Sequence, residues 1–168
     1  MTTEADDCPV DWDAWQPEML ATLMFIRVGD QVLLIEKKRG IGAGKINGPG
    51  GKIDPGETPE ECAIRETQEE LHVTATGVRK HGELHFAMSD IPDILCHVFL
   101  ADGYEGTPTE TDEAVPRWTS VNELPFERMW EDDQFWLSQL LEGQSFRGRF
   151  AFEGEHIVWQ QIDWSVDY

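Results

Sequence analysis

The sequence predicts a single α+β domain, and three observations lead to this fold class. The chain has 168 residues, which is within the usual length of one domain. Apolar residues make up 40% of it and include seven Trp and eight Phe, so the chain can bury a substantial core. The expected strands and helices follow one another without regular alternation, which favours an α+β fold or a sandwich over a doubly wound sheet.

The first expected elements are a β-hairpin and a glycine-rich loop. Two apolar strands, 21–27 and 31–36, flank the turn Val28-Gly29-Asp30. The loop Gly40–Gly51 follows and consists largely of Gly, Pro, Asn, Lys and Ala, a composition that allows close approach to the backbone. It is not a Walker A loop, because its GxxxGK spacing is one residue short and Ile46 replaces the Ser or Thr.

A helix is predicted next, from Pro59 to about Leu71. Thr58 is suited to the N-cap, Pro59 to the first helical position, and Glu61 closes a capping box.

The second half of the chain predicts several strands and a final helix. Asp132 or Asp133 can cap this helix, which reaches Glu142 and ends at Gly143. The strands expected here are Gly82–Met88, Ile94–Leu100, Val115–Trp118 and a hairpin over Arg147–Gln161 that turns at Glu153-Gly154.

Charge is distributed unevenly along the chain. There are 33 Asp and Glu against 13 Lys and Arg, a net charge of -20. Residues 1–20 hold six acids and no Lys or Arg, so we expect an acidic N-terminal extension before a domain spanning 21–168. A basic island precedes the dense acidic stretch 51–73, an arrangement expected where anions and divalent cations share a site; the alternative is a solvated acidic surface. The island consists of Lys37, Lys38, Arg39 and Lys45.

Composition also excludes several classes of protein. No apolar run approaches the ~18 residues of a membrane span, and the acidic N-terminus lacks a signal peptide's basic region, so neither membrane insertion nor export is expected. Cys8, Cys62 and Cys96 are odd in number and have no CxxC spacing, which fits a reducing cytoplasm. The negative charge disfavours a nucleic-acid polymer as partner, whereas a small polyanion is compatible if a metal ion offsets the repulsion.

Three carboxylates project from one side of the helix predicted at Pro59. Glu66, Glu69 and Glu70 are three and four residues apart. Like charges at these spacings destabilise a helix by roughly a few tenths of a kcal/mol per pair unless a cation lies among them. Carboxylate oxygens suit Mg²⁺ or Mn²⁺, which leave coordination positions for phosphate oxygens. The alternative is a solvated, Glu-rich face.

The spacing around these acids matches a known motif. The stretch GKIDPGETPEECAIRETQEELHV resembles the Nudix box, Gx5Ex7REUxEExGU, where U is a large aliphatic residue. Thr67 departs from the aliphatic position, and His72 replaces the Gly that ends the helix in a left-handed conformation. Because His tolerates that conformation better than most residues, we expect strain there without loss of the site. The six matching positions are Gly51, Glu57, Arg65, Glu66, Glu69 and Glu70.

Longer stretches resemble one branch of the Nudix superfamily. KKRGIGAGKINGPGGK, GTPTETDEAVPRW, LPFERMWEDDQFW and FRGRFAFEGEHIV are similar to the animal oxidised-purine nucleoside triphosphatases, MutT homologues that hydrolyse 8-oxo-dGTP. The resemblance implies a Nudix αβα sandwich with a mixed β-sheet. It also implies Mg²⁺-dependent hydrolysis of oxidised purine nucleoside triphosphates to the monophosphate and pyrophosphate, in nucleotide-pool sanitation. The partner is then a small nucleoside triphosphate, and we expect a cytoplasmic monomer.

The resemblance assigns roles to the acids. Glu70, Glu69 and Glu113 would carry catalysis; Glu70 is preferred over Glu113 as the base, although crowded carboxylates titrate as a group. Arg65 and Glu57 would hold the loop and helix together. The implied metal ligands are the Gly51 carbonyl, Glu66, Glu69, Glu70 and Glu113.

The same resemblance implies a purine pocket. Trp130, followed by paired Asp132 and Asp133, would bind the base, and two carboxylates in an apolar pocket should share one proton, giving one donor and one acceptor. The alternative for the Asp pair is simple helix capping. Further substrate-binding positions are Thr22, Lys37, Asn47 and Phe86.

Four pocket positions differ from the animal enzymes, which have Phe, Trp, Phe and Met where this chain has Ile41, Ile46, Pro49 and Ile94. Purine triphosphatase activity is therefore better supported than strict preference for 8-oxo-dGTP.

Two other functions stay open from the sequence. One is a Nudix hydrolase of other nucleoside polyphosphates; the other is a catalytically silent nucleotide-binding regulator, against which the retained glutamates argue. Trp12 and Trp15, before the domain, either pack on it or mark a contact site.

Overall fold

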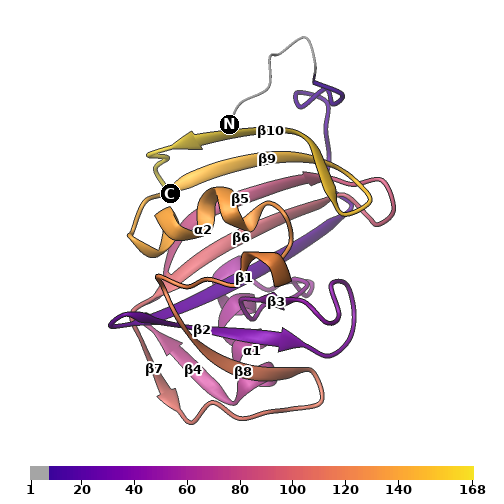
Figure 1. Ribbon diagram of the computed structural model, residues 1–168. Helices are drawn as coiled ribbons and strands as arrows, with labels where there is room; N and C mark the ends of the chain where they lie inside the picture. The colour runs from indigo at the N-terminus through magenta and orange to yellow at the C-terminus, as the bar shows by residue number, and fades with distance from the viewer. Residues whose placement is uncertain (1–7) are drawn as a thin grey trace.

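The computed structural model describes residues 8–168, and it has the expected α+β architecture (Figure 1). The main sheet has the strand order β10-β9-β5-β6-β1-β2-β3, with β8 also paired to β2, while β4 and β7 form a separate two-stranded sheet. The pairs β1–β6 and β5–β9 are parallel and the other pairs of the main sheet are antiparallel, so the sheet is mixed, as predicted.

The elements have the following bounds: β1 Met19–Val28, β2 Gln31–Lys37, β3 Ile46–Asn47, α1 Pro59–Leu71, β4 Val73–Thr76, β5 Arg79–Ala87, β6 Ile94–Ala101, β7 Gly103–Gly106, β8 Ala114–Ser120, a 3₁₀ turn Phe126–Arg128, α2 Asp133–Leu141, β9 Phe146–Glu153 and β10 His156–Trp164. The first seven residues of the expected N-terminal extension lie outside the described residues.

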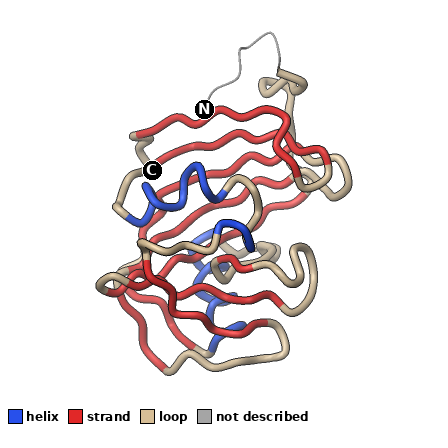
Figure 2. The backbone as a smooth tube through the Cα atoms, in the orientation of Figure 1, coloured by secondary structure: helices blue, strands red, loops and turns tan. Residues whose placement is uncertain are grey.

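The two helices lie on opposite faces of the main sheet, and each covers its own core (Figures 1 and 2). Successive residues of a strand point to opposite faces. Phe25 of β1 accordingly packs with Trp136 of α2, whereas its neighbours Met24 and Ile26 belong to the cluster that contains Ala63 of α1. Because both faces are buried, β1 and β2 have near-continuous apolar sequences.

Helix α1 has the predicted capping box. The Thr58 hydroxyl accepts the Glu61 backbone N–H at 3.1 Å, and the Glu61 carboxylate accepts that of Thr58 at 2.9 Å. The helix ends at His72, whose φ of 62° and ψ of 30° are left-handed, as expected for the residue that replaces Gly. Thr67, the other departure, is buried and donates its hydroxyl to the Ala63 carbonyl at 2.8 Å, so its polar group is satisfied within the helix.

Helix α2 is not capped by a side chain, so the capping interpretation of the Asp pair is wrong. Asp132 occupies the N-cap position with helical backbone angles, and its carboxylate makes no capping hydrogen bond. Its Oδ2 instead accepts the indole N–H of Trp136 at 2.8 Å, one turn along the helix.

Strands β4 and β7 were not predicted from the sequence. Both have only four residues, and Gly103 and Gly106 begin and end β7. They are strands because they pair with each other across about thirty residues of chain, a contact that local patterns do not report.

Trp12 and Trp15 pack on the domain, the first of the two alternatives that the sequence left open for them. Trp15 stacks on His85 with ring centroids 5.3 Å apart, and Trp12 lies 5.9 Å from the ring of Trp159. Within residues 8–168, no helix is long and apolar enough to cross a membrane.

The strain at His72 yields a stability prediction. His72→Gly should raise the free energy of unfolding by about 1 kcal/mol, because Gly adopts a left-handed conformation without the Cβ clash. Urea unfolding measures the change. His72→Ala is the control: Ala keeps the Cβ, so a gain of the same size in His72→Ala would show that the backbone angle is not the cause.

Candidate metal and nucleotide site

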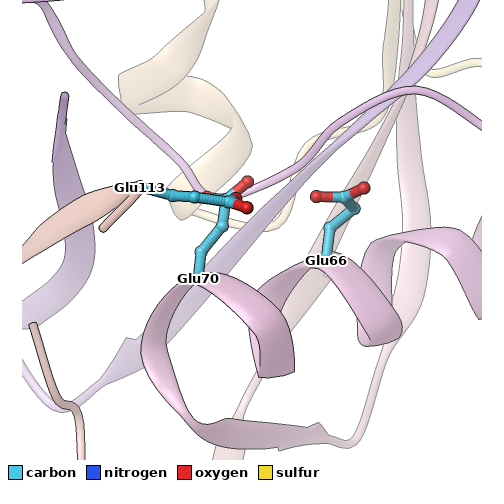
Figure 3. Close-up of side chains that lie close together, drawn as sticks. All are labelled: Glu66, Glu70 and Glu113. Atoms are coloured by element: carbon cyan, nitrogen blue, oxygen red, sulfur yellow. The ribbon is translucent and has the colours of Figure 1, made fainter. Parts of the chain in front are cut away.

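Three carboxylates meet beside helix α1. Glu66 and Glu70 project from successive turns of α1, and Glu113 reaches them from the loop just before β8 (Figure 3). Each offers an oxygen within 4.8 Å of the others, and this is the one such group of three potential ligands in the described chain. The structure therefore brings together three of the four predicted acidic ligands.

Glu70 is the most buried of the three acids. Its exposed fraction is 5%, and its Oε2 has no hydrogen-bond partner among residues 8–168. Burial first, and then the negative charges of Glu66 and Glu113, raise the pKa of Glu70 to about 9. The pKa of Glu66 is also raised, mainly by burial. A buried oxygen without a partner, among like charges, fits a divalent cation with oxygen ligands.

Glu69, also predicted as a ligand, is not brought into this cluster. Its carboxylate accepts hydrogen bonds from Nη1 of Arg65 at 3.2 and 3.3 Å, and half of its side chain is exposed. Glu69 is thus paired with the guanidinium one turn earlier on the helix and lies outside the group formed by Glu66, Glu70 and Glu113.

Arg65 joins the loop before α1 to the helix. Its Nε and Nη2 donate to the two oxygens of Glu57 at 2.6 and 2.8 Å, and its Nη1 donates to Glu66 at 2.9 Å. Nη2 also donates to the Lys52 carbonyl at 3.3 Å. The hydrogen bonds from Arg65 lower the pKa of Glu57 to about 2, so this pair stays ionised.

Gly51 brings the loop directly against the acids. A Cβ on Gly51 would lie 2.5 Å from the Glu66 carboxyl carbon, so no other residue fits here without displacing Glu66. The Gly51 carbonyl, predicted as a ligand, accepts the Thr22 backbone N–H at 2.9 Å. The Thr22 hydroxyl at 3.4 Å and the Cys62 thiol at 3.6 Å also donate to this oxygen, so a cation at the carbonyl would compete with these two longer bonds.

A cavity of about 240 Å³ lies beside the acid cluster. It borders the cluster through Gly51 and through Lys37, whose positive charge acts on Glu70. All seven predicted substrate-binding residues line it: Thr22, Lys37, Asn47, Phe86, Trp130, Asp132 and Asp133.

Sequence reasoning missed much of the apolar wall of this cavity. Of the four divergent positions, Ile41 and Ile94 line the cavity, whereas Ile46 and Pro49 do not. The missed residues come from β1, β6, β9 and the loop between β5 and β6, and no local motif marks them: Met19, Leu23, Met88, Ile91, Cys96 and Phe152.

Asp132 and Asp133 are adjacent carboxyl groups in the cavity wall, each only 2% exposed. Burial raises the pKa of Asp132 to about 6, against the opposing effect of the Trp136 hydrogen bond. The pKa of Asp133 is raised well above its usual range, by burial and by the charge of Asp132. The pair is thus suited to share a proton and to present one donor and one acceptor.

Lys45 connects the glycine-rich loop to Trp130, which lines the cavity, and to the β9–β10 turn. Its Nζ lies 5.0 Å from the ring centroid of Trp130 and 2.5 Å from the Glu155 carboxylate in the β9–β10 turn. Glu131, next to Trp130, accepts the Ile157 backbone N–H at 3.1 Å, which fixes this segment to β10.

The fold and this site define a Nudix domain. Residues 17–140 match the NUDIX domain family, so the chain belongs to that family; Trp12 and Trp15 precede the match.

Curated relatives indicate a particular branch of the family. The chain is 41% identical over 140 residues to the oxidized purine nucleoside triphosphate hydrolase of Danio rerio and 39% identical to that of Mus musculus. In both cases the match covers 83% of this chain and 90% of the relative. Among solved structures, a MutT protein from Bacillus halodurans has a TM-score of 0.77 at 24% identity, covering 86% of this chain and 97% of that one, which supports the fold.

The buried Asp pair predicts a pH-dependent stability. A carboxyl whose pKa is higher in the folded than in the unfolded state holds its proton more tightly when folded, so stability falls as pH rises from about 4 through 6. Asp133→Asn removes one of these groups and should lose less stability over that window than the wild type. Thermal unfolding in chelator across pH 4–8 measures this, with the exposed Asp30→Asn as control. If the melting temperatures of the wild type and of Asp133→Asn fall equally with pH, the prediction is contradicted.

The different surroundings of Glu69 and Glu70 yield a metal-binding prediction. Mg²⁺ should raise the melting temperature of the wild type, and Glu70→Gln should abolish most of this rise because it removes the central buried ligand. Glu69→Gln is the matched variant on the same helix and should keep most of the rise. If Glu69→Gln loses as much as Glu70→Gln, metal binding draws Glu69 away from Arg65.

Proposed function

We propose that this protein hydrolyses oxidised purine nucleoside triphosphates of the 8-oxo-dGTP type to the nucleoside monophosphate and pyrophosphate. The observation that carries the proposal is one cavity that borders both the acid cluster and the buried Asp pair. The activity printed for the zebrafish and mouse relatives supports the same reaction.

The Asp pair is suited to read the purine base. With one shared proton, Asp132 and Asp133 offer a donor and an acceptor side by side in a wall that excludes water. A base that does not match this pattern leaves buried polar groups without partners and is rejected. Trp130 and Phe86 supply the apolar faces that cover the ring, and Asn47 adds a polar group on the glycine-rich loop.

The acid cluster is suited to the triphosphate end. Glu66, Glu70, Glu113 and the Gly51 carbonyl would hold Mg²⁺, with Mn²⁺ as the alternative. When bound, the ion would offset the charge of the phosphates and provide Lewis-acid stabilisation of the transition state. Lys37 lines the cavity next to Glu70, where its ammonium group can meet phosphate oxygens.

Glu70 is our candidate for the base that accepts a proton from the attacking water, with Glu113 second. Glu70 is the most buried acid of the cluster, and one of its oxygens has no partner in the described part of the chain. Glu69 keeps its predicted catalytic and metal-binding role in the proposal only if metal binding releases it from Arg65.

The remaining assignments follow from the substrate. The partner is a small nucleoside triphosphate and not a nucleic-acid polymer, since the net charge of -20 repels long polyanions. We further propose a cytoplasmic monomer acting in nucleotide-pool sanitation, in which residues 1–20 extend a Nudix domain at 21–168.

A second candidate is hydrolysis of other modified purine triphosphates. Ile41 lines the cavity where the animal enzymes place Phe, so the wall has one aromatic ring fewer, and Ile94 lines it where they place the more flexible Met.

Turnover with Mg²⁺ tests the proposal. The wild type should hydrolyse 8-oxo-dGTP at least about tenfold more efficiently, in kcat/KM, than dGTP, because only the oxidised base matches the Asp pair. Chromatography should detect the monophosphate and pyrophosphate as products. Equal kcat/KM values for the two nucleotides would contradict the sanitation role, and full activity of Glu70→Gln would contradict the assignment of the base.

A further inference from the structure

We propose that Trp15 is a positioning residue for the nucleotide cavity. It fixes one wall of the cavity through Asp93 and does not touch the substrate. The inference deepens the proposed function, because it concerns the wall of the same cavity. It is carried by a continuous series of hydrogen bonds from the segment before β1 to the loop between β5 and β6.

Trp15 is held from two sides. Its indole N–H donates to Oδ2 of Asp93 at 2.9 Å, and its ring stacks on His85 of β5 at an interplanar angle of 29°. Trp12, three residues earlier, packs against Trp15 and Trp159, but its own indole N–H has no partner in residues 8–168. Of these two neighbouring indoles, Trp15 is the one bonded to the β5–β6 loop.

Asp93 is the junction of this series. Its other carboxylate oxygen, Oδ1, accepts the Met88 backbone N–H at 2.8 Å, which closes the loop on itself. Its carbonyl accepts the N–H groups of Glu18 and Met19 at 2.9 and 3.0 Å, and its own N–H donates to the Glu18 carboxylate at 3.1 Å. Asp93 therefore ties the loop both to Trp15 and to the start of β1.

The residues that Asp93 fixes form one wall of the cavity. Met19, Met88, Ile91 and Ile94 all line it, whereas Trp15 and Asp93 do not. Short loops have few buried contacts of their own, so the position of a cavity wall formed by a loop depends on the hydrogen bonds that hold the loop backbone. Loss of the Trp15 bond leaves a partly buried carboxylate oxygen unsatisfied and loosens this wall of the cavity.

Trp15→Phe and Trp12→Phe form a matched pair for the test. Both keep an aromatic ring and remove one indole N–H, but only Trp15 donates to Asp93. Trp15→Phe should raise KM about three- to tenfold with kcat nearly unchanged, because the net contribution of a typical intramolecular hydrogen bond corresponds to a change of this size. The Mg²⁺ concentration for half-maximal activity should not change, since the acid cluster lies on other elements. Trp12→Phe should leave KM at its wild-type value.

Asp93→Asn provides a second variant in the same series. Asp93 accepts the Trp15 and Met88 N–H groups with two different oxygens. In Asn one of these positions becomes an NH2 donor that faces an N–H, so KM should rise at least as far as in Trp15→Phe. The double variant should not exceed Asp93→Asn alone, because Trp15 acts through Asp93. Additive effects on KM would overturn the proposal.

Hydrogen exchange gives a readout that does not depend on turnover. Backbone amides of residues 88–94 should exchange faster in Trp15→Phe than in Trp12→Phe, measured without nucleotide. Equal exchange in both variants, or equal KM values, would overturn the role of Trp15. If the wild type hydrolyses dGTP as well as 8-oxo-dGTP, the proposed function fails while this comparison still decides the inference, with whichever nucleotide is hydrolysed faster.

Discussion

The candidate site depends on the hydrogen bonds that the Arg65 guanidinium donates. It donates to both oxygens of Glu57, to Glu66 and to the Lys52 carbonyl, so one side chain binds the loop before α1 to two turns of the helix. Such bidentate, charge-assisted bonds have a fixed geometry that Lys could not supply. They place the loop so closely that Gly51 has no room for a Cβ beside Glu66. The Arg65 network thus holds the loop against the acid cluster, together with the backbone bond from Thr22 to the Gly51 carbonyl.

The cluster itself opposes folding, and the surrounding helix must offset that cost. Glu70 is buried beside Glu66 and Glu113, which raises the free energy of the ionised form. Helix α1 is nevertheless held at both ends, by the capping box at Thr58 and by the burial of Leu71 in the sheet core. Local stability of the scaffold thus permits an arrangement of charges that is unfavourable without a cation, as is common at functional sites.

Local patterns in the sequence predicted the parts of the fold and site that depend on near neighbours. The capping box at Thr58 and the Glu66–Glu70 spacing are set within one or two helical turns, and both appear in the structure as expected. The β4–β7 pairing could not be predicted, because it depends on segments far apart in the sequence. Glu69 bonds to Arg65 and Asp132 bonds to Trp136, each four residues away. The spacing allows these contacts, but it equally allows the predicted metal ligand and the helix cap, so it does not decide between them.

The acids at the candidate site differ in the counter-charge that is available to neutralise each of them. Glu57 is paired with Arg65, which lowers its pKa and makes it a permanent structural charge. Glu70 has like charges around it and an oxygen without a partner in the described chain, a combination that a cation satisfies. Asp132 and Asp133 have an apolar wall and each other, so a proton is the available counter-charge. Carboxyl groups thus serve here as a structural ion-pair partner, as a cation site and as a hydrogen-bonding pair. The neighbours of each carboxyl group decide which of these roles it has.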